Sequence, residues 1–408
     1  MDTFIARQPI FDRQQKVYAY ELLFRSSLEN VFDFSDPDKA SSKVISNGLF
    51  LFGMESITGG KKAFINVTRD VLMKEYVTLL PKGLTVVEIL ETVEPESEVI
   101  EACKKLKQAG YLIALDDFVY EERFKPLVEM ADIIKVDFLA TGEAERRNLV
   151  QRFGPQGIHF LAEKVETREV FQEALEIGYA YFQGYFFSKP VILSRKDIPG
   201  FKFHYLEILR EVNRPELDFG QLEDIIKREI SLSYKLLRYI NSAVFAWASK
   251  IDSIKRALVL LGEREVKKWV SLIALVSMGN DKPEELLVQA IIRAKFCESL
   301  APVVALARRA QELFLMGMFS LIDAIVDQPL ADLLRGIPLA TDVTAALLGE
   351  ENRLRHIYEC AMAYEHGDWE KFSEWAAGLG MDQAGTPRLY LEAVKWGQLS
   401  FRSGFLSG

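Results

Sequence analysis

The first 190 residues alternate between short runs rich in β-branched and aromatic residues and longer amphipathic stretches, and this alternation limits the fold more than any other feature. Strands separated by helices predict a largely parallel sheet with crossover helices. We therefore predict an α/β domain in this half of the chain. The predicted strands are TFIARQPI, VYAYELLF, AFINV, TVVEIL, LIALDD, IIKVDF, HFLAEKV and AYFQGYFF.

Polar side chains fall near the end of nearly every predicted strand. In a closed (β/α) barrel the carboxyl ends of the strands share one mouth, where such side chains can converge, so this placement favours a barrel. An open doubly wound sheet is the alternative. Because about 190 residues is short for a fold that typically has nearer 250, we expect some helices to be missing or replaced by loops. The polar residues are Glu21, Asn66, Glu88, Asp116, Lys135, Glu163 and Gln183.

Carboxylates dominate this set, which contains Glu21, Glu88, Asp116 and Glu163, with Asp117 adjacent. If they share a mouth, Lys135 and two divalent cations would balance their five negative charges. Together with the amide oxygen of Asn66 they form a hard-oxygen set suited to Mg²⁺ or Mn²⁺ rather than Zn²⁺. Pairs of such ions serve phosphodiester chemistry. Taken singly, each acid could instead cap a helix, Lys135 could pair with Asp137, and Asn66 and Gln183 could be turn residues.

The rest of the chain has an apolar period close to 3.6, which predicts an all-α domain. We place the α/β domain at residues 1–195 and the helical domain at residues 196–408. HD-type phosphohydrolases need several histidines, whereas only His356 and His366 lie late in this half. We expect these two to be ordinary surface or satisfied histidines and Trp369 to pack between helices.

The overall charge excludes some partners. A formal net charge of −9 argues against a surface for nucleic acid or anionic membranes, either of which would need a dense basic field. The segment MDTFIARQPI lacks a basic stretch followed by an apolar run, and the chain has no run of about 18 apolar residues. We therefore expect a cytoplasmic protein with no nucleic-acid or membrane partner.

Residues 4–190 resemble the EAL-domain cyclic di-GMP phosphodiesterases. RQPIFD resembles the family's opening segment, and YELLFR stands where its E-A-L-x-R signature does, with Leu22 in place of alanine. FINV, EILE, LDDF, IIKVD, LAEKVET and FQGYFFSKP match later motifs in order. The resemblance implies a TIM-like barrel that uses Mg²⁺ or Mn²⁺ to open cyclic di-GMP to a linear dinucleotide.

The resemblance also implies a role for each matching residue. Asp117 would join the metal or water site, and Lys135 would act on the nucleophilic water. Gln183 would line the site, while Gln8 and Arg25 would meet the guanine or phosphate of the dinucleotide. Glu21, Lys135 and Asp117 are thus the candidate catalytic residues. The implied metal ligands are Glu21, Asn66, Glu88, Asp116, Asp117 and Glu163.

The sequence differs from the family at three places where a change would affect hydrolysis. After the two aspartates the family has a Gly-Thr-Gly loop, where this chain has Val119, Tyr120, Glu121 and Glu122. Lys164 replaces a glycine and places an ammonium group where it could compete with a metal. Leu90 replaces the threonine before Glu91. These changes suggest weak or absent hydrolysis.

Residues 219–372 resemble the HDOD family, a non-catalytic relative of HD enzymes found in bacterial signalling proteins, through SLSYKLLRYINSAVF and SIKRALVLLG. Our leading hypothesis is a bacterial signalling protein whose degenerate EAL domain hydrolyses cyclic di-GMP weakly or not at all but can bind it. Its HDOD domain would bind a protein partner. The alternative is an active Mg²⁺- or Mn²⁺-dependent phosphodiesterase, and the resemblance is compatible with a homodimer.

Overall fold

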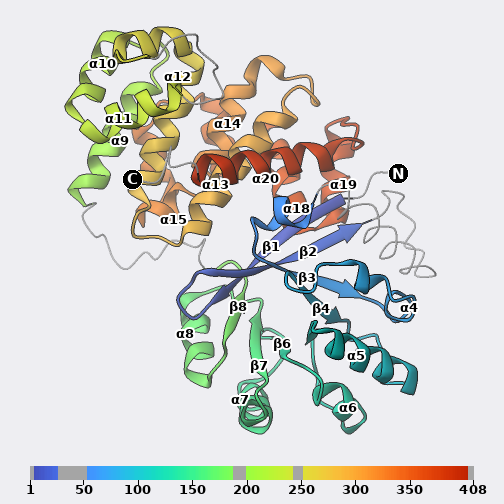
Figure 1. Ribbon diagram of the computed structural model, residues 1–408. Coiled ribbons are helices and arrows are strands. Elements are labelled where there is room, and N and C mark those ends of the chain that lie inside the picture. Colours follow the sequence, from blue (N-terminus) through green and yellow to red (C-terminus); the bar gives the residue numbers. More distant parts are fainter. Residues whose placement is uncertain (1–3, 26–52, 187–198, 242–250, 403–408) are drawn as a thin grey trace. The chain divides into compact units, whose positions relative to one another are not determined.

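The computed structural model describes residues 4–25, 53–186, 199–241 and 251–402. Eight strands close into a barrel in sequence order, which confirms the predicted α/β barrel (Figure 1). The strands are β1 (Phe4–Asp12), β2 (Val17–Arg25), β3 (Lys62–Val67), β4 (Thr85–Ile89), β5 (Leu112–Leu115), β6 (Ile133–Asp137), β7 (His159–Glu163) and β8 (Tyr181–Gln183).

β1 runs antiparallel to both of its neighbours, β2 and β8, whereas the other neighbouring strands are parallel. The cause is the short turn after β1, in which Asp12 Oδ1 accepts hydrogen bonds from the backbone N–H groups of Gln14 and Lys16. Parallel neighbours need a crossover of about a dozen residues or more, so this turn can only form a hairpin. Gln8 consequently lies opposite Glu21.

A layer of buried apolar residues, one from each of the first seven strands, fills the barrel below its mouth. Side chains two residues apart on a strand point to the same face. The residues two positions beyond this layer therefore also face the interior, and on the reversed strand β1 the equivalent residue lies two positions before it. The apolar layer consists of Ile10, Ala19, Phe64, Val86, Ala114, Ile133 and Leu161.

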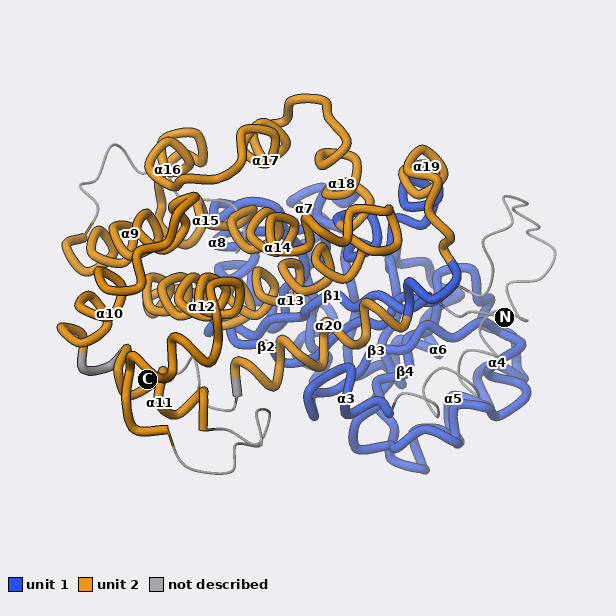
Figure 2. Tube along the Cα trace, turned by 90° about the horizontal axis from the view of Figure 1, so that it is seen from above, with its two compact units in different colours: residues 1–189, 362–373, 384–387 blue, residues 190–361, 374–383, 388–408 orange. Residues whose placement is uncertain are grey.

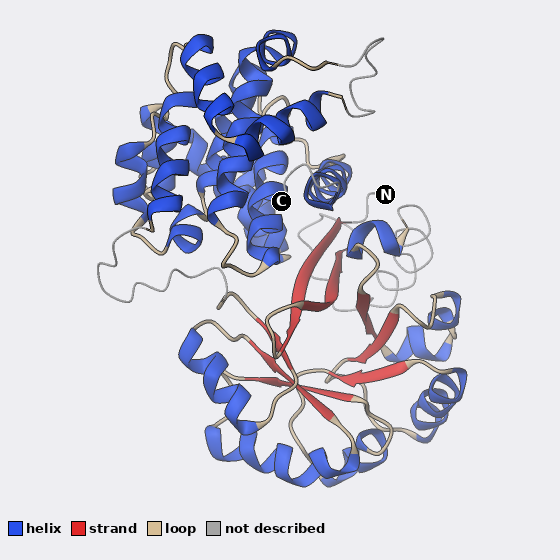
Figure 3. Ribbon diagram, turned by 60° about the vertical axis from the view of Figure 1, so that its left-hand side comes forward, coloured by secondary structure: helices blue, strands red, loops and turns tan. Residues whose placement is uncertain are grey.

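Helices surround the strands of the barrel, as Figure 3 shows. The hydroxyl group of Thr68 caps α4 and that of Thr167 caps α8, by accepting hydrogen bonds from backbone N–H groups. Some crossovers are short, as the chain length predicted: α6 has four residues. The helices are α3 (Met54–Thr58), α4 (Arg69–Met73), α5 (Ser97–Ala109), α6 (Lys125–Val128), α7 (Glu143–Phe153) and α8 (Arg168–Ile177), with 3-10 turns at Tyr76–Leu79, Glu122–Phe124 and Gly154–Gln156.

The chain forms two compact units, coloured separately in Figure 2, and the second is helical as predicted. Gly262, with φ of 72°, interrupts α12. Among the described residues no helix has the length and apolarity needed to cross a bilayer. The helices are α9 (Gly200–Val212), α10 (Phe219–Arg228), α11 (Ile230–Ile240), α12 (Ile254–Met278), α13 (Glu284–Leu300), α14 (Ala310–Phe319), α15 (Ile322–Val326), α16 (Leu330–Gly336), α17 (Thr341–Leu347), α18 (Arg353–His366), α19 (Trp369–Gly378) and α20 (Thr386–Arg402), with a 3-10 turn at Ala307–Arg309.

Each of the two units is formed by more than one segment of the chain. Residues 362–373 and 384–387 belong to the barrel unit, together with residues 1–189. Helix α18 therefore begins in the helical unit and ends in the barrel unit, and α19 returns the chain. The boundary expected at residues 195 and 196 lies outside the described residues.

The segment 362–373, which we call the C-terminal insertion, packs on β1 through aromatic side chains. The ring centroid of Phe4 lies 6.2 Å from that of Tyr364, 5.9 Å from that of Trp369 and 6.0 Å from that of Phe372. Phe4 is buried, and full burial of such a ring contributes about 1.5–3 kcal/mol. Trp369 thus packs against a barrel strand as well as a helix, which the sequence pattern did not predict.

Candidate functional site

The strand-end residues predicted from the sequence form one polar layer above the apolar layer. Six of them lie two residues after a member of the apolar layer. Gln183 lies two residues after Tyr181, which is half-buried and packs against that layer, and Gln8, on the reversed strand β1, lies two residues before Ile10. The structure therefore brings eight of the ten predicted site residues into this layer: Gln8, Glu21, Asn66, Glu88, Asp116, Lys135, Glu163 and Gln183. Asp117 follows directly after Asp116.

Lys135 is the ionic centre of the layer. Its Nζ lies 3.4 Å from Glu21 Oε2, 2.8 Å from Asp116 Oδ1 and 2.9 Å from Glu163 Oε1, and it also pairs with Glu88. The side chain of Lys135 is 1% exposed and that of Glu88 is fully buried. Four carboxylates thus converge on one ammonium group. The structure supplies these partners in place of the simple pair with Asp137 that the sequence also allowed.

The charges of this cluster are strongly coupled. Burial raises the pKa of Glu88 well above its ordinary value, against the opposing effect of Lys135. Burial likewise raises the pKa of Glu163 to about 8. Burial alone would lower the pKa of Lys135, but the surrounding carboxylates raise it well above its ordinary value. The ammonium group therefore stays charged, and the raised pKa values of Glu88 and Glu163 mean that these two acids hold protons more tightly than ordinary carboxyl groups, protons that an incoming cation would displace.

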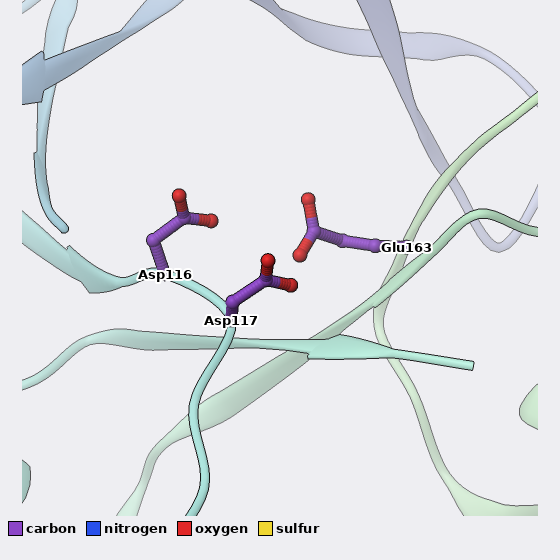
Figure 4. Close-up of side chains that lie close together, drawn as sticks. All are labelled: Asp116, Asp117 and Glu163. Carbon is purple, nitrogen blue, oxygen red and sulfur yellow. The ribbon is translucent and has the colours of Figure 1, made fainter. Parts of the chain in front are cut away.

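Asp116, Asp117 and Glu163 form the part of the cluster best placed to hold a metal ion. Each offers one carboxylate oxygen, and these oxygens lie within 4.8 Å of one another. Figure 4 shows the three side chains approaching one another from the ends of β5 and β7. Asp117 adopts φ of 38°, a left-handed conformation that aspartate tolerates better than most residues.

The donor set of the layer fits Mg²⁺ or Mn²⁺. Four of its buried oxygens have no hydrogen-bond partner among the described residues: Asn66 Oδ1, Glu88 Oε2, Glu163 Oε2 and Gln183 Oε1. A buried acceptor without a donor costs about 1–3 kcal/mol, a cost that a bound cation or ligand would remove. All four atoms are oxygens from carboxylate or amide groups, the ligands that hard divalent cations prefer.

A hydrogen-bonded pair of glutamines lies beside Glu21. Gln183 Nε2 donates to Glu21 Oε2 at 2.7 Å and to Gln8 Oε1 at 3.0 Å. Gln183 precedes Gly184, which approaches Val165 so closely that a Cβ atom would lie 2.1 Å from the Val165 carbonyl oxygen. The side chain of Arg25, at the end of β2, is outside the described part of the structure.

The Gln8 side chain has a partner that the sequence did not indicate. Its Nε2 donates to the backbone carbonyl oxygen of His366 at 3.0 Å. His366 was expected to be an ordinary histidine of the helical half, yet it lies in the C-terminal insertion. No sequence pattern links two residues that are 358 positions apart.

The altered loop after Asp117 is held by side-chain contacts. The Arg152 guanidinium group lies 4.0 Å from the centroid of the Tyr120 ring and donates a 2.8 Å hydrogen bond to its hydroxyl group. Arg123 forms ion pairs with Glu94 at 2.6 Å and with Glu121 at 2.8 Å. The loop thus has an alternative set of supports where the related family has glycines.

Lys164 has a partner outside the acid cluster. It forms an ion pair with Asp137, and this hydrogen bond is the largest cause that raises the pKa of Lys164. Its φ of 54° explains why a glycine suits this position. The charge of Lys164 still acts on the cluster, since Asp117 and Glu163 contribute to the raised pKa.

We predict that Lys164→Gly will tighten binding of Mn²⁺ by about two- to fivefold, the effect of one partly exposed charge. The variant removes a positive charge near Asp117 and Glu163, and glycine accepts the left-handed backbone. Affinity can be measured by electron paramagnetic resonance titration. Lys164→Gln is the matched control because it removes the charge but keeps the strained backbone. Unchanged affinity in both variants would show that Lys164 does not compete with the metal.

A closed eight-stranded barrel with a carboxylate-rich mouth, followed by a helical unit, defines the class of this protein. The EAL domain family matches residues 60–190, and the HDOD domain family matches residues 198–328. An EAL domain protein of known structure from Listeria monocytogenes is 21% identical, with a TM-score of 0.38, over 46% of this chain and 87% of that one.

Two relatives match almost the whole chain. An uncharacterized protein, YuxH of Bacillus subtilis, is 37% identical over 97% of this chain and 98% of its own length. The cyclic di-GMP phosphodiesterase CdgJ of Vibrio cholerae is 36% identical over 97% of this chain and 92% of its own length. The chain belongs to the family of bacterial proteins in which an EAL domain is followed by an HDOD domain, related to cyclic di-GMP phosphodiesterases.

Proposed function

We propose that this protein is a Mg²⁺- or Mn²⁺-dependent phosphodiesterase that hydrolyses cyclic di-GMP to its linear dinucleotide. The observation that carries the proposal is the polar layer, in which acids surround Lys135 and four buried oxygens lack partners within the described part of the chain. The 36% identity to CdgJ over nearly the whole chain supports the choice of substrate.

The proposed metal ligands are the acids of the layer, Asp117 and the amide oxygen of Asn66. A pair of bound divalent cations would supply a metal-activated water and neutralise charge on the phosphate. Their ligands would be Glu21, Asn66, Glu88, Asp116, Asp117 and Glu163.

The other site residues would orient the reactants. Lys135 keeps its proton because acids surround it, so it can donate hydrogen bonds to the attacking water or to a phosphate oxygen but cannot serve as a base. Gln8 and Gln183 would hold the dinucleotide, with Gln183 Oε1 free to accept from a guanine N–H group. Arg25 would pair with a phosphate group.

Binding of cyclic di-GMP with little hydrolysis is the second candidate function. The contacts of Arg152 with Tyr120 and of Arg123 with Glu121 favour it, because they fix a loop that is glycine-rich in the related family. A fixed loop next to Asp117 would slow any closure needed for turnover.

One experiment separates the two functions. The full-length protein is incubated with cyclic di-GMP and Mn²⁺ or Mg²⁺, and the linear product is followed by chromatography, with EDTA as the metal-free control. Metal-dependent turnover supports the phosphodiesterase. Saturable binding in calorimetry without product supports the binding protein, and the absence of both overturns the two proposals together.

Restoring glycine at positions 119 and 121 is predicted to raise kcat severalfold. Val119→Gly with Glu121→Gly relaxes the backbone next to Asp117 and removes the pair between Arg123 and Glu121. Steady-state kinetics with cyclic di-GMP measure the effect. Glu129→Gly, at an exposed position directly after α6, controls for a general loss of order. An unchanged kcat would show that the loop does not limit the reaction.

We also propose roles for the rest of the chain. The HDOD domain would bind a protein partner in the cytoplasm, and the chain would act as a homodimer. Light scattering of the full-length protein tests the oligomeric state. Limited proteolysis between residues 187 and 198 tests the proposed domain boundary at residue 195.

A further inference from the structure

The C-terminal insertion reaches the candidate site as well as the outer end of β1. Its aromatic side chains pack on Phe4, and the rings of His366 and Tyr185 lie 4.5 Å apart between centroids. Four residues from Phe4 along β1, Gln8 donates a hydrogen bond to the carbonyl oxygen of His366. Residues distant in sequence therefore contribute to the surroundings of a proposed substrate-binding residue.

A continuous chain of hydrogen bonds joins this carbonyl group to the acid cluster. Gln8 donates to His366 at 3.0 Å, Gln183 donates to Gln8 at 3.0 Å, and Gln183 donates to Glu21 at 2.7 Å. Glu21 in turn contacts Lys135. The chain thus ends on a proposed metal ligand.

Both ends of this chain are acceptors, and this fixes the orientation of the two amides between them. A backbone carbonyl and a carboxylate can only accept hydrogen bonds. Gln8 must therefore turn its Nε2 to His366 and its Oε1 to Gln183, which must use its Nε2 for both Gln8 and Glu21. A rotated Gln8 amide would bring two oxygens together at His366 and two N–H groups together at Gln183.

We infer that the turn formed by His366 and Gly367 is a positioning element of the candidate site, holding Gln8 and Gln183 in the orientation that recognises the cyclic dinucleotide. The inference rests on the proposed function and extends it to a segment far from the EAL motifs. His366 acts through its backbone carbonyl and touches no reacting atom, so it is a positioning residue.

Helix α18 connects the helical unit to this turn along the chain. Helix α18 begins at Arg353 in the helical unit and ends at His366 in the barrel unit. A shift or rotation of α18 along its axis moves the carbonyl of its last residue. Such a movement would break the hydrogen bond to Gln8 without altering a residue of the acid cluster.

Gly367→Ala is the variant that displaces the turn most directly. Gly367 has φ of +69°, and a Cβ atom there would lie 2.5 Å from Leu23 Cδ1. Alanine is therefore both strained and in collision, so that the turn, the Leu23 side chain or both must move. Leu23→Ala in the same chain removes the colliding group and should restore the turn. Gly380→Ala is the matched control, because Gly380 has φ of +63° with nothing within 4 Å of the added Cβ.

The test measures the affinity for cyclic di-GMP by calorimetry in EDTA, and KM and kcat with Mn²⁺. Gly367→Ala and Gln8→Ala are each expected to raise Kd and KM about fivefold, the effect of one hydrogen bond, with kcat within about twofold. The double variant should be no weaker than either single one, instead of the roughly 25-fold loss expected for independent sites. Adding Leu23→Ala to Gly367→Ala should restore Kd, and Gly380→Ala should leave it unchanged.

The outcomes separate this inference from the proposed function. Wild-type binding or turnover with additive losses in the double variant would overturn the positioning role and leave the function standing. Failure of Leu23→Ala to restore Kd in a folded Gly367→Ala protein would also overturn it. A wild-type protein that neither binds nor hydrolyses cyclic di-GMP would end the proposed function, and this inference with it. Thermal unfolding confirms that each variant is folded.

Discussion

Replacing Glu21 by glutamine is expected to lower the rate of cyclic di-GMP hydrolysis by about a hundredfold or more, while the barrel stays folded. Both carboxylate oxygens of Glu21 are in use: Oε1 accepts from Asn66 at 3.3 Å, and Oε2 accepts from Gln183 at 2.7 Å. Glutamine keeps the shape of the side chain but removes a negative charge proposed to hold a divalent cation.

Stability is expected to change much less than activity. Glu21 contributes to the raised pKa of Glu88, which means that the two carboxylates repel each other. Removing that charge lowers this repulsion, but it also removes an attraction to Lys135 and turns a glutamine N–H group toward another donor, so the unfolding midpoint in EDTA should fall only by a few degrees. A large loss of rate with only a small loss of stability is expected for a functional acid and not for a structural one.

Chromatography of the linear product and calorimetric unfolding in EDTA measure the two effects. Glu101→Gln, at an exposed position on α5, makes the same chemical change outside the barrel and should affect neither. A Glu21→Gln protein that hydrolyses at the wild-type rate would exclude the cluster as the active site. One that unfolds at much lower temperature would instead identify Glu21 as a structural residue.

The barrel and its polar layer could be predicted because both follow from local patterns. Side chains along a strand point alternately to its two faces, so a polar residue two positions after an interior apolar one must face the same way, as Glu88 does after Val86 and Lys135 after Ile133. Closure of the sheet then brings these positions together. The antiparallel direction of β1 could also be predicted, because the turn between Asp12 and Val17 is too short for a crossover.

Contacts between distant segments could not be predicted in this way. The sequence indicated that Lys164 could compete for the acids, but it did not indicate the ion pair with Asp137, which forms because β6 and β7 are paired so that Asp137 lies beside Glu163. The register between two strands sets this pair, and a single strand does not reveal it. The bond from Gln8 to His366 depends on how the last third of the chain returns to the barrel, for which the sequence has no local pattern.

The acid cluster is thus held in two ways, by one buried ammonium group and by a rim of amide donors. Asn66 and Gln183 donate to Glu21 from two sides, and the carbonyl of His366 orients the second of these donors through Gln8. The ammonium supplies the charge balance, whereas the amides supply geometry. Removing the ammonium group should therefore lower the free energy of unfolding. Breaking the hydrogen bonds between the amide groups should lower the affinity for the ligand.

Lys135→Met is accordingly expected to destabilise the metal-free barrel unit by about 3–5 kcal/mol, the usual effect of removing one partner from a buried ion pair. The unfolding midpoint should fall by about 10 °C for a unit of this size. Methionine fills nearly the same space, so the loss would come from four carboxylates left without their shared cation. Lys104→Met, at an exposed position on α5, is the control and should have little effect.

The pH and metal dependence of Lys135→Met distinguish lost charge balance from poor packing. Lys135 lowers the pKa of Glu88 and of Glu163, so its removal raises both further. An acid whose pKa is higher in the folded than in the unfolded state stabilises at low pH and loses that contribution as the pH rises. The variant should therefore approach wild-type stability near pH 5 and lose it as the pH rises through 8. Mn²⁺ at about a hundred times its Kd should restore about 2.7 kcal/mol of the free energy of unfolding. A loss of stability that changes with neither pH nor Mn²⁺ would show that Lys135 stabilises the barrel by packing instead.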